Sequence, residues 1–245
     1  MATNNFLLRM IGNSNGNYSN KYNRAQKLIN NWDVIKAKVE RYVIKGKGKT
    51  ILSKRAWLVL LMMETGIRIG NTASANGYVS KNKFGKHFNK IVKTFGAITL
   101  QVKHCKLSKD GQSLRISFLG KKQVQINTST NNPIIIKYFP VMVSGKEPND
   151  LVFETKARFI NGFIIKRIGH YFTAKDLRTA IVNLIYIDNA KFPASIKNKR
   201  EAKLIMKLAL EKAAEFAGHT PGVCKSKYVS PDMLWGYQES LFSLI

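Results

Sequence analysis

The chain has 245 residues, 44% of them hydrophobic, so it can bury a core and does not have the composition of a disordered protein. Lysine and arginine total 41 against 14 acidic residues, and this formal net charge of +27 favours nucleic acid as a partner. A membrane is the less favoured partner, because no apolar run reaches the roughly 20 residues of a bilayer span and the basic residues are spread along the chain. The absence of a signal-peptide pattern predicts an intracellular protein with reduced thiols.

The first fifty residues are predicted to form a polar arm followed by helices. Residues 1–20 are polar, and we expect a flexible arm. Residues 21–44 carry apolar side chains at helical spacing, which predicts one or two helices. The basic loop that follows, residues 45–49, is either a solvated linker or a contact to a phosphate backbone.

A strongly apolar helix is predicted next, over residues 54–64. Ser53 is its expected N-cap, and Gly66 is expected to end it. The segment from Asn71 onward contains glycine, asparagine and lysine and is predicted to be a loop.

Three short strands are predicted in the middle of the chain. Residues 97–107 alternate between apolar and polar side chains, and Asp110-Gly111 is a hairpin turn signal. The strands Leu114–Leu119 and Val124–Thr128 follow, with Gly120 and Lys121 at the second turn. The pattern indicates a three-stranded antiparallel sheet over roughly 97–128.

The rest of the chain is predicted to be helical. Pro133 can open a short helix, and Gly218 is expected to cap the last strongly amphipathic one. The other predicted helices cover 156–170, 174–188, 201–217 and 231–245. The fold class is therefore α+β, mostly helical with a small antiparallel sheet, and residues 21–245 are expected to form one domain.

Five side chains in this order suit the transesterification of a phosphodiester: Arg68, Lys121, Arg178, His219 and Tyr228. Arginine binds phosphate through a bidentate fork, and histidine can donate a further hydrogen bond to a phosphate oxygen. A lysine on a tight turn can protonate the leaving oxygen, and a tyrosine among cations can act as the nucleophile. No acidic cluster is placed to hold Mg²⁺, so we expect chemistry without a metal or other cofactor.

Each of these residues alone also has a structural explanation. Arg68 follows a helix end, where the dipole favours a cation. Lys121 can be a polar turn residue, and Tyr228 a half-buried aromatic. Their order, with each residue set in its own local string, is what favours the catalytic interpretation.

Those strings resemble the type IB DNA topoisomerases, above all the small poxvirus-like and bacterial members. They are Thr65–Asn71, Phe118-Leu119-Gly120-Lys121, Lys175–Thr179 and Gly218–Tyr228, and the likeness covers roughly residues 50–235. It implies the catalytic domain of DNA breaking-rejoining enzymes, double-stranded DNA as the partner, a monomer, and relaxation of supercoils without metal or ATP. The small size and the poxvirus-like strings indicate, as part of the resemblance, a virus, phage or bacterium as the source.

The resemblance also implies a role for each residue. Tyr228 would form a 3′-phosphotyrosyl link, Arg68 and Arg178 would bind the scissile phosphate, and Lys121 would protonate the 5′ oxygen. His219 would hydrogen-bond a non-bridging oxygen, with Lys175 in an auxiliary position. The related small enzymes carry an N-terminal β-rich clamp domain, which we expect this chain to lack. Further candidates for contacts to DNA phosphates are Lys45, Lys47, Lys49, Lys81, Lys83, Lys86, Lys197, Lys199, Arg200, Lys225 and Lys227.

Two other functions fit the same strings. A tyrosine recombinase or integrase shares the catalytic domain and would exchange strands as an oligomer on DNA, but such enzymes usually have histidine where this chain has Lys175. A DNA-binding protein without activity would share the scaffold, but all five expected functional side chains are present. The topoisomerase is the preferred interpretation.

Overall fold

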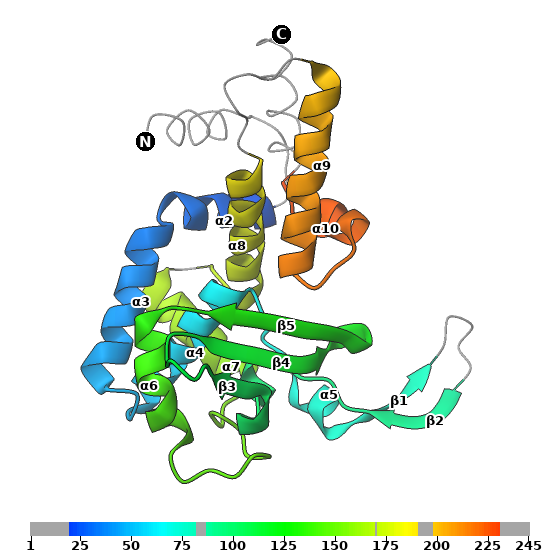
Figure 1. Cartoon of the computed structure of the whole chain (residues 1–245). Helices are drawn as coiled ribbons and strands as arrows, with labels where there is room; N and C mark the ends of the chain where they lie inside the picture. The colour runs from blue at the N-terminus through cyan, green and yellow to red at the C-terminus, as the bar shows by residue number, and fades with distance from the viewer. Residues whose placement is uncertain (1–19, 82–86, 170, 191–197, 231–245) are drawn as a thin grey trace. The chain divides into compact units, whose positions relative to one another are not determined.

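The computed structural model describes residues 20–81, 87–169, 171–190 and 198–230, in two compact units (Figure 1). The central unit comprises Asp33–Lys175, and the terminal unit combines Met1–Trp32 with Asp176–Ile245. The predicted arm and the predicted helix over 231–245 lie outside the described residues, apart from Asn20. Within the described part of the chain, no helix is long and apolar enough to cross a membrane.

The core of the central unit is α4 (Ile51–Thr65), which is buried on nearly all sides, as its continuous apolar sequence predicts. Gly66 ends the helix in the left-handed conformation, with φ 61°, which confirms its predicted role. The predicted N-cap was wrong: Thr50 caps the helix and accepts from the Ser53 amide. Ser53 lies inside the helix because its hydroxyl instead donates to the Val43 carbonyl at 2.9 Å.

Three helices of the central unit accompany α4: α3 (Trp32–Gly46), α6 (Pro133–Val143) and α7 (Ala157–Phe163), which continues as the π-helical turn η4 (Ile164–Ile168). The Trp57 indole of α4 donates to the Ile135 carbonyl of α6 at 3.1 Å. Its ring stacks on Phe139, with centroids 6.2 Å apart. Helices α6 and α7 with η4 confirm the helices predicted after Pro133 and over 156–170.

The predicted three-stranded antiparallel sheet is confirmed, in the order β3-β4-β5. Its strands are β3 (Cys105–Leu107), β4 (Leu114–Gly120) and β5 (Val124–Thr130), with Leu114 paired to Thr130 and Gly120 to Val124. The first strand is shorter than predicted, because residues 97–104 form the 3₁₀ turns η1 (Ala97–Thr99) and η2 (Val102–His104). There the Val102 amide donates to the Asp150 carbonyl at 3.0 Å and not to a strand.

The segment predicted to be a loop after Asn71 contains a short helix and a hairpin. Helix α5 (Thr72–Asn76) is followed by β1 (Tyr78–Lys81) and β2 (His87–Val92), which pair antiparallel. The hairpin extends away from the three-stranded sheet (Figure 1). Val79 and Ile91 pair across it and are both exposed, so this apolar pair does not mark a buried face in the way that would have predicted strands.

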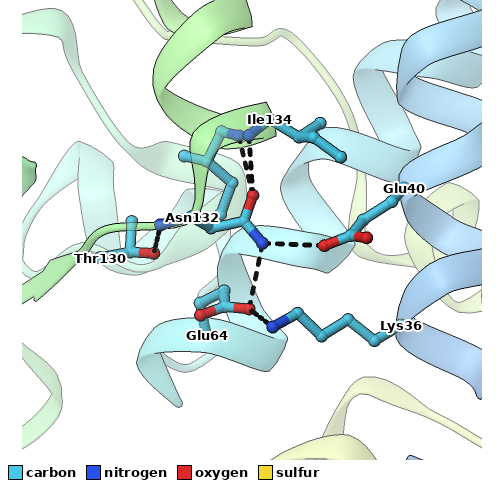
Figure 2. Close-up of polar contacts among 7 residues, drawn as sticks. Lys36, Glu40, Glu64, Thr130, Asn132 and Ile134 are labelled. Carbon is cyan, nitrogen blue, oxygen red and sulfur yellow. Dashed lines mark hydrogen bonds and ion pairs between the residues drawn. The ribbon is translucent and has the colours of Figure 1, made fainter. Parts of the chain in front are cut away.

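A polar network joins α3, α4 and the junction between β5 and α6 (Figure 2). The Asn132 side chain accepts from the Ile134 and Ile135 amides and so caps α6. Its amide nitrogen donates to Glu40 at 2.9 Å and to Glu64 at 3.3 Å. Lys36 completes the network with an ion pair to Glu64 at 2.6 Å.

The described part of the terminal unit is helical. Its helices are α2 (Asn20–Asn30), α8 (Ala174–Asn189, which begins in the central unit), α9 (Lys199–Phe216) and α10 (Pro221–Lys227). Helices α2, α8 and α9 match predicted helices. Helix α10 was not predicted, although Thr220 and Pro221 supply an N-cap and a proline at the first helical position.

Candidate active site

Three of the five predicted catalytic residues lie together in the terminal unit. The His219 imidazole stacks on the Tyr228 ring, with centroids 4.9 Å apart and planes at 25°. The Arg178 guanidinium carbon is 5.4 Å from the Tyr228 ring centroid, and one of its nitrogens is 3.3 Å from His219 Nε2. The cluster unites a tyrosine hydroxyl with two groups that can bind a phosphate oxygen.

His219 is positioned by the end of α9. Gly218 adopts a left-handed conformation, with φ 59°, directly after the cap residue Ala217. The Gly218 amide donates to Glu215 at 3.0 Å and the His219 amide donates to Ala214 at 2.8 Å. This pair of bonds is a Schellman motif, and it fixes the residue after the glycine.

Tyr228 is positioned by α10 and α8. It follows the last residue of α10, and its amide donates to the Cys224 carbonyl at 2.9 Å. Asn183 of α8 donates to the Tyr228 carbonyl at 2.9 Å and accepts from the Ser230 amide at 2.9 Å. Tyr228 is 9% exposed. Because the Asn183 side chain binds the backbone of both Tyr228 and Ser230, the backbone of Tyr228 has little freedom.

Arg178 is 6% exposed and lies on α8, where it also donates to the Ala217 carbonyl. Next to it lies the buried Cys224, whose thiol has a pKa raised to about 11 by burial, an effect that the Arg178 charge only partly opposes. The thiol is therefore neutral at physiological pH and does not neutralise the guanidinium charge.

Helix α2 supplies contacts that were not predicted. Arg24 forms an ion pair with Asp176 of α8 at 3.1 Å, two residues before Arg178. Lys21 donates to the Lys227 carbonyl and lies 6.0 Å from the Tyr228 ring centroid. Among these unpredicted positioning residues, Asn183 had a signal in the sequence, because it is an amide within the apolar run of α8. The α2 contacts had none, because they join residues more than 150 positions apart.

Arg68 and Lys121 belong to the central unit. The backbone near each of them hydrogen-bonds to the same short segment, residues 95–97. The Ala97 amide donates to the Arg68 carbonyl at 2.8 Å, and two residues earlier the Phe95 amide donates to the Leu119 carbonyl at 2.8 Å. Lys121 opens the turn η3 (Lys121–Gln123) and is exposed. The segment 95–97 therefore links the backbones on which both cations stand.

The Arg68 loop depends on a close approach of two glycines. Gly70 has φ 78°, and a Cβ atom on Gly96 would lie 2.6 Å from Gly70 Cα and 2.7 Å from the Arg68 oxygen. The string Thr65–Asn71 thus contains a glycine that permits the left-handed turn and meets a second glycine.

The other predicted cations are spread over both units. Lys175 is exposed in the first turn of α8, and Lys45, Lys47 and Lys49 are exposed around the loop before α4. Lys199, Arg200, Lys225 and Lys227 are exposed on α9 and α10, and Lys81 lies in β1. Lys83, Lys86 and Lys197 lie outside the described residues. Assembly of the residues from both units into one centre stays a prediction.

Residues 13–237 match the family described as eukaryotic DNA topoisomerase I, catalytic core. This match spans most of the chain, and the chain belongs to that family. The preference for a topoisomerase family is therefore confirmed.

Viral proteins are among the relatives. DNA topoisomerase 1B of Acanthamoeba polyphaga mimivirus is 23% identical over 229 residues, covering 85% of this chain and 63% of the relative. DNA topoisomerase I of Monkeypox virus is 28% identical over 158 residues, covering 62% of this chain and 48% of the relative. The chain thus spans between about half and two thirds of the length of these relatives.

Among solved structures, the chain is similar to the XerH site-specific recombinase, bound to a palindromic difH substrate in a post-cleavage complex. It superposes with a TM-score of 0.47 and 14% identity, covering 85% of this chain and 51% of that chain.

Proposed function

We propose that this chain is the catalytic part of a type IB DNA topoisomerase that relaxes supercoiled double-stranded DNA. The observation that carries the proposal is the cluster of Arg178, His219 and Tyr228 in a chain of that family. The net charge of +27 supports DNA as the partner.

Tyr228 is the nucleophile in this proposal. Its hydroxyl oxygen attacks the phosphorus, the bond from phosphorus to the 5′ oxygen breaks, and a 3′-phosphotyrosyl link forms. The phenolic proton passes to water, and Lys121 gives a proton to the departing 5′ oxygen. One phosphodiester bond replaces another, so the step needs no ATP.

The remaining residues stabilise the charge on the phosphate. Arg178 and Arg68 bind the non-bridging oxygens, and His219 donates a further hydrogen bond. Lys175, three residues before Arg178 in the sequence, has an auxiliary role. After the free strand has rotated, the 5′ hydroxyl attacks the phosphorus and Tyr228 leaves, which restores the DNA strand with changed linking number.

The test is relaxation of negatively supercoiled plasmid in EDTA without ATP. Wild type should produce a ladder of topoisomers, and Tyr228→Phe should bind DNA without relaxing it. Tyr171→Phe is the matched control, because Tyr171 is an exposed tyrosine of the central unit and should retain full activity. Relaxation by Tyr228→Phe would disprove the assignment of the nucleophile, and strand exchange between paired sites without relaxation would favour a recombinase.

The role of Lys121 is tested separately. Lys121→Ala should slow cleavage by about 100-fold or more, as expected for loss of a general acid. A substrate with a 5′-bridging sulfur should restore the rate, because a thiolate leaves without a proton. Lys122→Ala, at the next position of the same turn, should behave as wild type, and failure of the sulfur substrate to rescue Lys121→Ala would count against the acid role.

A further inference from the structure

Helix α2 is fastened to the helix that carries Arg178. Its Arg24 pairs with Asp176, whose side chain is 1% exposed, while Arg24 is 34% exposed. Ala25, Leu28 and Ile29 of α2 are buried. Since a buried carboxylate needs its partner, the ion pair gives α2 a defined place beside α8 within the terminal unit.

Lys21 lies one turn before Arg24, on the same face of α2. Its ammonium group donates to the carbonyl of Lys227, the last residue of α10. That carbonyl belongs to the peptide group that joins α10 to Tyr228. The contact therefore holds the backbone on the amino side of Tyr228, while Asn183 holds its carbonyl side.

The charge of Lys21 suits this place better than its own helix. A cation in the first turn of α2 opposes the helix dipole, whereas a cation at the last carbonyls of α10 is favoured by the dipole of that helix. The ammonium group is also 4.2 Å from the Tyr22 ring centroid and 6.0 Å from that of Tyr228, within the reach of a cation–π contact.

We propose that Lys21 is a positioning residue for the nucleophile: it fixes Tyr228 through the Lys227 carbonyl and adds positive charge beside the ring. The inference rests on the proposed function of Tyr228. During attack the phenolic oxygen loses its proton to water and bonds to phosphorus, and a nearby cation favours the negative charge on that oxygen before the new bond is complete. Arg178 binds the phosphate, so Lys21 serves the tyrosine.

The first experiment measures single-turnover formation of the covalent complex with a suicide duplex at saturating concentration. Lys21→Met keeps an unbranched apolar stem and removes the charge, and it should slow cleavage by about 10- to 100-fold with little change in DNA affinity. Lys21→Arg keeps the charge and should restore most of the rate. Lys27→Met is the matched control, because it removes an exposed lysine of the same helix and should leave the rate unchanged.

The second experiment measures amide hydrogen exchange in the peptide over residues 221–230 without DNA. Exchange should be faster in Lys21→Met than in wild type or Lys27→Met, because the anchor at the Lys227 carbonyl is lost. Equal exchange, or a wild-type cleavage rate in Lys21→Met, would overturn the proposal. So would a lowered melting temperature of Lys21→Met with no recovery of cleavage in Lys21→Arg.

The two experiments separate this proposal from the proposed function. Wild type that fails to cleave, or Tyr228→Phe that still cleaves, counts against Tyr228 as the nucleophile. The exchange measurement needs no cleavage and still decides whether Lys21 holds the segment before Tyr228.

Discussion

Arg68 lies in a loop that is held by contacts between backbone atoms. Its carbonyl accepts from the Ala97 amide, and Gly96 lies so close that no side chain fits between it and Gly70. In the proposed function Arg68 binds the scissile phosphate, and these backbone contacts fix the point from which its side chain extends.

Gly96→Ala tests this support. The new Cβ would meet backbone atoms at 2.6 and 2.7 Å, so the loop must shift, and we expect a loss of about 1–3 kcal/mol in the free energy of unfolding. Cleavage should fall as well, because Arg68 moves with the loop. Gly162→Ala is the control, since nothing lies within 4 Å of its Cβ and alanine is the better helix residue. Unchanged stability in Gly96→Ala would show that the loop yields freely.

His104 makes the stability of the central unit depend on pH. Burial, with the Lys103 charge adding to it, lowers its pKa from 6.5 to about 4, and its Nδ1 accepts from the Gln101 amide at 3.1 Å. The unfolded chain therefore takes up this proton first. The stabilising contribution is fully present above pH 6.5 and is lost as the pH falls toward 4.

Melting temperatures between pH 7.5 and 4.5 check this expectation. His104→Asn keeps an acceptor for the Gln101 amide but does not titrate, so its melting temperature should fall less across this range than that of wild type. A parallel decline in both proteins would assign the pH dependence to other groups.

At the scale of the elements, Asn132 connects three helices through one side chain (Figure 2). Asn132→Asp preserves the N-cap but replaces the amide donor with a third carboxylate beside Glu40 and Glu64. We expect a loss of about 1–3 kcal/mol in the free energy of unfolding. Aspartate is a good N-cap, but it cannot donate to the two glutamates and its charge repels theirs.

Denaturant unfolding of matched variants separates the two effects. Asn132→Ser keeps an N-cap without adding charge and should be milder than Asn132→Asp. Asn131→Asp adds the same charge at the exposed neighbouring position and should be close to neutral. If Asn132→Asp were as stable as Asn132→Ser, the contacts to Glu40 and Glu64 would carry no weight.

The helices and strands that could be predicted are those with a local sequence signal at their ends or along their length. Turns that favour glycine or Asp-Gly end the elements at Gly66, Asp110-Gly111 and Gly218, and α4 has a continuous apolar sequence. The β1–β2 hairpin was missed because its described apolar side chains are partly on the exposed side. Residues 97–104 alternate like a strand, but residues 100–103 hydrogen-bond to residues 148–152, and such long-range pairings are not visible in a local pattern.

The same distinction holds for the site. The strings around Arg178, His219 and Tyr228 could be found because each residue has a local motif. Asn183 and Lys21 matter only through contacts to distant segments, and no spacing in the sequence points from α2 to Tyr228.

At the scale of the whole molecule, charge is unevenly distributed along the chain. No acidic residue occurs in the sequence between Glu64 and Asp110, a stretch that contains Arg68 and the lysines around the β1–β2 hairpin. On α9, by contrast, Lys207 and Lys212 pair with Glu211 and Glu215 at 3.9 and 3.3 Å. Lysines that form ion pairs should therefore contribute less to DNA binding than lysines in segments of the sequence without acidic residues.

Salt dependence of DNA binding measures that difference. If about six or more phosphates are contacted, the logarithm of the association constant should fall with the logarithm of salt concentration at a slope of about −5 or steeper. Replacing Lys45, Lys47 and Lys49 together by glutamine should reduce the slope by about 2–3, close to 0.9 for each lost contact. The double variant Lys207→Gln, Lys212→Gln removes lysines that already have acidic neighbours and should leave the slope nearly unchanged. Because both variants lower the net charge, a reduction in the first alone would show that the loop before α4 touches the DNA backbone, whereas reductions in proportion to the charge removed would mean that the total charge acts without defined contacts.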